Sequence, residues 1–231
     1  MEAGRLWGDA EPASETEMGD HDMAVHWPAP IEVLRRLAEV SEQRGEPIGD
    51  LIVLVGGNAM AAHGIRGASR DVGAYTPVVS DEAVAQVEAE LRGRYGPDFR
   101  IDLTTVENIW GLIMIRDLAR APRVAQIVSP AGRTHTVRAL SIEDLYVLKV
   151  ASGRRRDSDD LPLAAPRTSA DAIIARFNTL LPGIGNRAAI PAIADALVRN
   201  LAAHYGLAPA RIIEQLAVSS GIKAELREAH A

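Results

Sequence analysis

The sequence predicts an α/β (α+β) fold: a small mixed sheet with flanking helices, followed by a helical C-terminal region. Three observations carry this prediction. A short apolar run at 51–55, rich in β-branched residues, is typical of a buried strand. The last part of the chain is Ala-rich and helical in pattern. Further strand-like runs alternate with helical patterns and lie at 71–75, 100–104, 124–128 and 134–139.

The composition indicates a core built from aliphatic side chains. Of 231 residues, 47% are hydrophobic and 4% aromatic, and none is cysteine. The length suits one large domain, or a catalytic domain with an extension. The lack of cysteine excludes disulfides and thiolate metal sites and fits a cytoplasmic protein. No apolar run approaches the roughly 18 residues of a membrane span, so we expect no membrane partner.

The formal net charge of −6 argues against a broadly basic surface that coats nucleic acid. A local basic patch for RNA stays compatible with this charge.

The N-terminal half is predicted as follows. Residues 1–30 are polar with little periodicity and are interpreted as a flexible leader. A helix over 31–43 has its apolar residues on one face. After the strand at 51–55, a short helix is expected to begin near Asn58, a good N-cap residue. A further helix begins after the cap Ser80 and gives way to a connector at 92–98.

The C-terminal half continues with a hairpin formed by 124–128 and 134–139. Ser141 is expected to cap a helix that runs to about Ser152. Two prolines indicate a linker at 161–169, so a first domain would cover 31–165 and a helical region 166–231. The run 110–115 is ambiguous between helix and strand. Helices of the last region are expected over 170–181, 188–205 and 209–219.

The stretch 51–76 also contains the candidate site. Gly56 and Gly57 follow the first strand, where a glycine pair allows close approach of a ligand to the backbone. Free N–H groups at the start of the next helix suit a phosphate. Asp71 and Asp102 lie on two later strands, and carboxylates that converge from neighbouring strands can hold a divalent cation. The alternatives are an ordinary tight turn and two solvated aspartates.

These residues together resemble a known family. Gly56-Gly57, then Arg66-x-x-Ser69-x-Asp71, then the isolated Asp102, are similar to the nucleotidyltransferase superfamily of DNA-polymerase-β type. The wording GGNAMAAHGIRGASRD most resembles minimal nucleotidyltransferases similar to AbiEii, the toxin half of abortive-infection toxin–antitoxin pairs. The resemblance covers roughly residues 30 to 165 and continues through the segments 141–149 and 153–161.

The resemblance implies a nucleotidyltransferase-like domain that binds a nucleoside triphosphate (NTP) with Mg²⁺ or Mn²⁺. A nucleoside monophosphate would pass to RNA, such as tRNA, or to protein, and an antitoxin protein would be the partner. Asp71 and Asp102 would bind the metal, and Asp102 would also act as base. Lys149 would assist at the triphosphate. The implied nucleotide contacts are Gly56, Gly57, Asn58, Arg66, Ser69, Arg156 and Asp157.

One position departs from the family pattern. The second metal-binding carboxylate would fall at position 73, where this chain has glycine. Two-metal transfer uses cations about 3.5–4 Å apart that share carboxylate ligands, so losing one ligand should weaken the pair. The chain is therefore a degenerate copy, a one-metal enzyme, or a form that carries a substitution.

Two alternative functions follow from this departure and from the fold. The first is a catalytically impaired binding or regulatory protein that keeps its nucleotide or RNA contacts. The second is a nucleotidyltransferase that modifies a small molecule such as an aminoglycoside. Two interpretations also stay open for the basic run 154–156 and for Lys149. These side chains either contact phosphates or occupy solvated surface positions.

Overall fold

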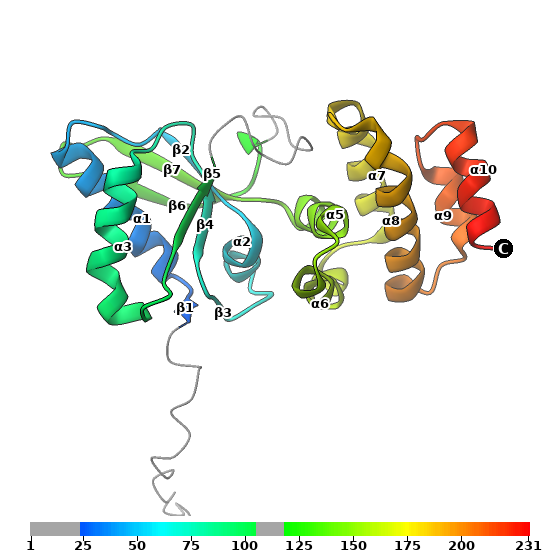
Figure 1. Ribbon diagram of the computed structural model, residues 1–231, viewed down its shortest axis with the longest axis horizontal. Coiled ribbons are helices and arrows are strands. Elements are labelled where there is room, and N and C mark those ends of the chain that lie inside the picture. Colours follow the sequence, from blue (N-terminus) through cyan, green and yellow to red (C-terminus); the bar gives the residue numbers. More distant parts are fainter. Residues whose placement is uncertain (1–23, 105–117) are drawn as a thin grey trace, which may run out of the picture.

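The chain folds as a mixed α/β protein with a helical C-terminal region, as predicted (Figure 1). This computed structural model describes residues 24–104 and 118–231, except for the side chain of Arg156. The ambiguous run 110–115 and most of the expected leader lie outside the described residues.

The described sheet has five strands in the order β5-β4-β2-β7-β6. The pairs β2–β7 and β4–β5 are parallel, whereas β2–β4 and β6–β7 are antiparallel, so the sheet is mixed. The central strand β2 is buried from its second residue onward, as its unbroken apolar run predicts. The strands are β2 (Leu51–Leu54), β4 (Val72–Tyr75), β5 (Ile101–Thr104), β6 (Arg123–Val128) and β7 (Thr134–Ala139).

Helices flank the sheet on both faces. Helices α1 (Ala29–Gln43) and α3 (Asp81–Tyr95) lie together on one face, and α2 (Gly56–Ala62) lies on the other (Figure 1). Ser80 caps α3 as predicted, since its side chain accepts a hydrogen bond from the Ala83 amide. The expected connector from position 92 is wrong, because α3 continues to Tyr95, whose ring packs 5.1 Å from that of Phe99.

A second, two-stranded sheet joins the segment before the first helix to the segment after α2. Strand β1 (Val25–His26) pairs antiparallel with β3 (Ala68–Ser69), and Val25 is fully buried. Residues 24–30, which the sequence assigned to the leader, thus include a strand and the start of α1. Pairs of two residues are too short to show any periodicity, so the sequence did not reveal them.

The segment after the hairpin contains two helices in succession. Ser141 caps α5 (Ile142–Ser152) by accepting the Asp144 amide at 3.1 Å, as predicted. The linker expected from position 161 is wrong, because α6 (Arg155–Ala164) continues through Pro162. Its apolar side is buried at Leu161 and Ala164, and this packing outweighs the local preference of proline.

The C-terminal region packs onto α5 and extends away from the sheet (Figure 1). The phenol of Tyr146 on α5 lies 2.7 Å from Nδ1 of His204 on α8. The sequence missed α10, which Ser219 caps. The elements are η2 (Ala165–Arg167), α7 (Ala170–Leu180), η3 (Leu181–Gly183), η4 (Arg187–Ala189), α8 (Ile190–Tyr205), α9 (Pro209–Gln215) and α10 (Ser220–Ala229). In the described residues, no helix combines the length and apolar character that crossing a membrane requires.

Candidate functional site

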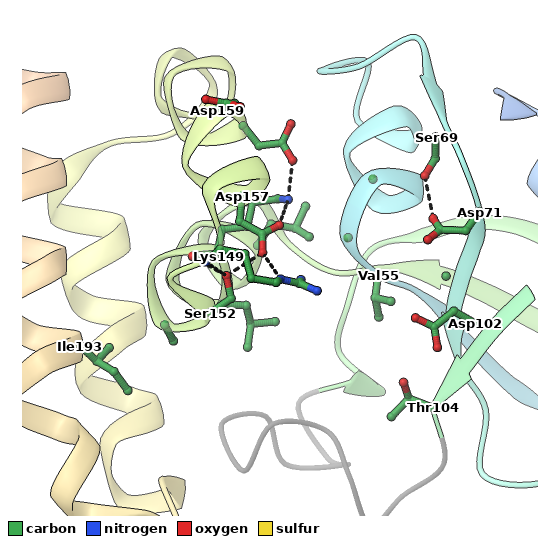
Figure 2. A pocket seen from close by; sticks show the side chains of 18 of the residues that line it. Val55, Ser69, Asp71, Asp102, Thr104, Lys149, Ser152, Asp157, Asp159 and Ile193 are labelled. Carbon is green, nitrogen blue, oxygen red and sulfur yellow. Dashed lines mark hydrogen bonds and ion pairs between the residues drawn. The ribbon is translucent and has the colours of Figure 1, made fainter. Parts of the chain in front are cut away.

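A cavity of about 820 Å³ lies between the sheet and helices α5 and α6 (Figure 2). Its lining brings together the predicted site residues from four separate segments of the chain. Asn58 is absent from that lining, and the side chain of Arg156 lies outside the description. The predicted residues that line the cavity are Gly56, Gly57, Arg66, Ser69, Asp71, Asp102, Lys149 and Asp157.

Asp71 and Asp102 reach the cavity from neighbouring parts of the sheet, at the start of β4 and within β5. Asp102 lies on β5 opposite Gly73 of β4, and Asp71 directly precedes β4 rather than belonging to it. Positions 71 and 73 face the same side of the sheet because side chains alternate along a strand. Ser69 donates its hydroxyl to Asp71 Oδ1 at 3.0 Å. Within the described residues, neither carboxylate forms an ion pair.

The surroundings of Gly73 are closely packed. A β-carbon built on residue 73 would lie 3.3 Å from Val55 Cγ2 and 3.8 Å from the Asn58 amide nitrogen. Val55 is itself held to β4, because its amide donates to the carbonyl of Gly73 at 3.1 Å. The site is therefore packed around a glycine, and a carboxylate there would require its neighbours to move. Among residues 24–104 and 118–231, no group of three or more acidic or histidine side chains is arranged to hold a metal.

The glycine pair turns the chain directly from β2 into α2. The predicted start near Asn58 is wrong, because the helix begins at Gly56 with Val55 in the N-cap position. Gly56 has a φ of +52°, which side chains other than glycine rarely adopt. A β-carbon on Gly57 would lie 2.7 Å from the Ser69 hydroxyl. The turn therefore requires both glycines, and its backbone faces the cavity.

Asn58 has a different place from the one expected. Its side chain is buried and donates its amide to the backbone carbonyl of Asp71 at 2.8 Å. Its Oδ1 is buried without a hydrogen-bond partner among the described residues. Asn58 thus positions the segment that carries Asp71 rather than lining the cavity.

Lys149 is buried beside the cavity in a network of ion pairs (Figure 2). Its ammonium donates to Asp160 at 2.6 Å and to Asp157 at 3.1 Å. Arg154 and Arg66 bind the same two carboxylates from the outside, at 2.6 Å and 3.1 Å. Lys149 therefore lies at the cavity, as expected, but its ammonium is already paired with the carboxylates of Asp157 and Asp160.

The described charges at this wall of the cavity balance. Lys149, Arg66 and Arg154 share the carboxylates of Asp157 and Asp160. The exposed carboxylate of Asp159 on α6 also lines the cavity and supplies the third negative charge. Burial opposes ionisation of Asp157, yet hydrogen bonds from Ser152, Arg154 and Lys149 lower the pKa of its carboxyl below the ordinary value of 3.8. The carboxylate thus stays charged at neutral pH and holds the cations in place.

Several residues of the cavity were not predicted. Leu145 and Ser152 lie four residues before and three residues after Lys149 on one face of α5, and this spacing was a usable signal. Leu148, directly before Lys149, also lines the cavity. Arg70 and Asp159 are exposed charges that no motif singled out. The C-terminal region contributes Ile184, Gly185, Asn186, Ala189 and Ile193, and nothing in the sequence connected these to the site.

Comparison of the chain with protein-family models, with curated proteins and with solved structures finds no match. The function therefore has to be argued from the geometry of this cavity.

Proposed function

We propose that the protein binds a nucleoside triphosphate with a divalent cation in this cavity and transfers the nucleoside monophosphate to an acceptor hydroxyl. One observation carries the proposal. Asp71 and Asp102, without a cationic partner among the described residues, share a cavity with the Gly56–Gly57 turn and with the ion-pair network around Lys149.

The residues fit a hard cation at one side of the cavity. Mg²⁺ and Mn²⁺ prefer oxygen ligands, and the carboxylates of Asp71, directly before β4, and of Asp102, on the neighbouring strand β5, supply them. Ser69 donates to one oxygen of Asp71 and leaves the other oxygen available. When bound, the cation would neutralise charge on the phosphate oxygens.

The transfer follows from the roles of the surrounding groups. The backbone at Gly56 and Gly57 would bind the phosphates, and Arg66 would contact them from the rim. Asp102 would take the proton of the acceptor hydroxyl. The hydroxyl oxygen then forms a bond to the α-phosphorus as the bond from that phosphorus to the β-phosphate oxygen breaks, and pyrophosphate leaves.

For the acceptor we favour RNA, such as tRNA, over a protein. Arg66, Arg70 and Arg154 line the cavity with exposed or half-exposed guanidinium groups, which suit the phosphates of an RNA backbone. The resemblance to abortive-infection nucleotidyltransferases supports a toxin role with an antitoxin protein as partner. We propose the cytoplasm as the compartment, in keeping with the absence of cysteine.

A second candidate is a protein that binds the nucleotide without turnover. Gly73 favours it, because the position of the expected second carboxylate is packed against Val55. A third candidate is transfer to a small cationic acceptor such as an aminoglycoside, which an acidic acceptor pocket would favour. The exposed carboxylate of Asp159 in the lining supports this candidate.

The test separates binding from transfer. Mn²⁺ affinity is measured with and without NTP, and label transfer from each α-labelled NTP to total RNA, to protein and to aminoglycosides is followed. Asp71→Asn and Asp102→Asn should each weaken Mn²⁺ binding and abolish transfer. Asp98→Asn, at an exposed aspartate outside the cavity, is the matched control. Binding without transfer would favour the second candidate, and absence of binding would refute all three.

A further inference from the structure

The cavity has a second end, which the C-terminal region forms. The loop between η3 and η4 and the first turn of α8 line it, opposite the sheet. Figure 2 shows Ile193 of α8 across the cavity from Asp102 and Thr104 of β5. Because α7 and α8 pack directly on α5, this wall is fixed to the helix that carries Lys149.

The two ends differ in chemistry. The end at the sheet and at α6 contains the charged side chains of the lining. At the other end the lining is mostly apolar, with Leu148 and Ala151 on α5 and Ile184, Ala189 and Ile193 from the C-terminal region. Asn186 is the exception there: its side chain is exposed and forms no hydrogen bond within the described residues.

We propose that this apolar end binds the base of the nucleotide and that Asn186 selects which base is accepted. The inference rests on the proposed function and adds to it the determinant of substrate choice. A nucleobase has apolar faces and a polar edge, so it matches a slot with aliphatic walls and one amide. An asparagine amide presents a donor and an acceptor together, which is what reading a base edge requires.

The loop leaves space for a ligand at Gly185. This residue carries no side chain, and a β-carbon there would meet no atom within 4 Å, so a ring has room beside the backbone. The cavity volume of about 820 Å³ lies within the roughly 300–1,000 Å³ of small-molecule sites. Phosphates at the glycine turn would leave the apolar end for the rest of the nucleotide.

The first experiment compares ligands that differ only in having a nucleoside. Dissociation constants are measured with Mn²⁺ for inorganic tripolyphosphate and for each of the four ribonucleoside triphosphates. At least one nucleotide should bind more tightly than tripolyphosphate. Ile193→Ser should weaken that nucleotide about tenfold, the scale of a lost apolar contact in a pocket, and leave tripolyphosphate unchanged. Leu163→Ser, at an exposed leucine of α6 outside the lining, is the matched control.

The second variant should fold as the unaltered protein does, because the side chain of Asn186 is exposed. Asn186→Ala should reduce the spread of affinities among the four nucleotides without changing the tripolyphosphate affinity. The inference is overturned if nucleotides and tripolyphosphate bind equally to the unaltered protein, or if Ile193→Ser and Asn186→Ala change only acceptor affinity. Either result leaves the proposed function intact, whereas failure to bind both ligand types removes the proposed function itself.

Discussion

Val55 Cγ2 lies 3.3 Å from the position that a β-carbon on residue 73 would take, and the Val55 amide donates to the Gly73 carbonyl. The two residues are therefore linked twice, by the close packing of the Val55 side chain against position 73 and by the backbone hydrogen bond. This coupling decides how far a missing carboxylate can be restored by a single change.

We expect Gly73→Asp to lower the free energy of unfolding by about 1–3 kcal/mol, the usual cost of overpacking. Val55→Ala in the same chain should recover part of that loss. Urea denaturation measures both. Gly93→Asp is the control, since a β-carbon there meets nothing within 4 Å and glycine inside α3 is unfavourable. An unchanged stability of Gly73→Asp would contradict the packing described around Val55.

Lys149→Met should destabilise the protein by about 3–5 kcal/mol, because it leaves Asp157 and Asp160 buried without their shared cation. Asp160→Asn added to this variant should restore part of the stability. Arg227→Met, which breaks an exposed pair with Glu214, should cost only about 0–1 kcal/mol in the same denaturation experiment. Equal losses of stability for Lys149→Met and Arg227→Met would show that burial of the Lys149 network has no energetic effect.

Gly57→Ala should cost about 1–3 kcal/mol and weaken Mn²⁺ binding, because its β-carbon would displace the Ser69 hydroxyl from Asp71. Gly57→Ala combined with Ser69→Gly should recover stability without recovering Mn²⁺ affinity. Thermal unfolding and Mn²⁺ titration on the same samples separate the two effects. Full recovery of affinity in the double variant would exclude a role for the Ser69 hydroxyl.

His204 should make the protein less stable as the pH falls. Burial lowers its pKa below the ordinary value of 6.5, so below that pH the unfolded chain binds the proton more readily than the folded one. Stability is therefore complete above about pH 6.5 and declines as the pH drops below it. His204→Gln should reduce this decline between about pH 7.5 and pH 5.5, whereas His26→Gln, at an exposed position, should not. Identical pH profiles for the two variants would contradict the prediction.

The sequence predicted the parts of this protein that depend on local patterns. The strand at 51–55, the hairpin, the caps at Ser80 and Ser141 and the helices α7 and α8 each follow from a local pattern of residues. Two of the wrong boundaries share one cause. At Pro162 and at 92–95, tertiary packing of Leu161 and Tyr95 overrides what the local composition favours.

The candidate site shows the same division. Glycine and aspartate motifs predicted that Gly56, Gly57, Asp71 and Asp102 belong to one site, and all four line the same cavity. Asn58 was misassigned, because a motif gives its position but not the direction of its side chain. Ile193 and Asn186 were not predicted for a different reason. They belong to no motif and lie far along the chain, so the sequence does not indicate that they line this cavity.

The pairing of β1 with β3 gives residues 25 and 26 an influence on a site they never touch. Val25 is paired with Ser69, and Ser69 holds the carboxylate of Asp71 through its hydroxyl. Trimming the chain to the start of α1 would remove one strand of that ladder and release the loop next to Asp71. Under the proposed function, cation affinity would then depend on an upstream dipeptide, and proteolytic cleavage ahead of the first helix would weaken cation binding at Asp71.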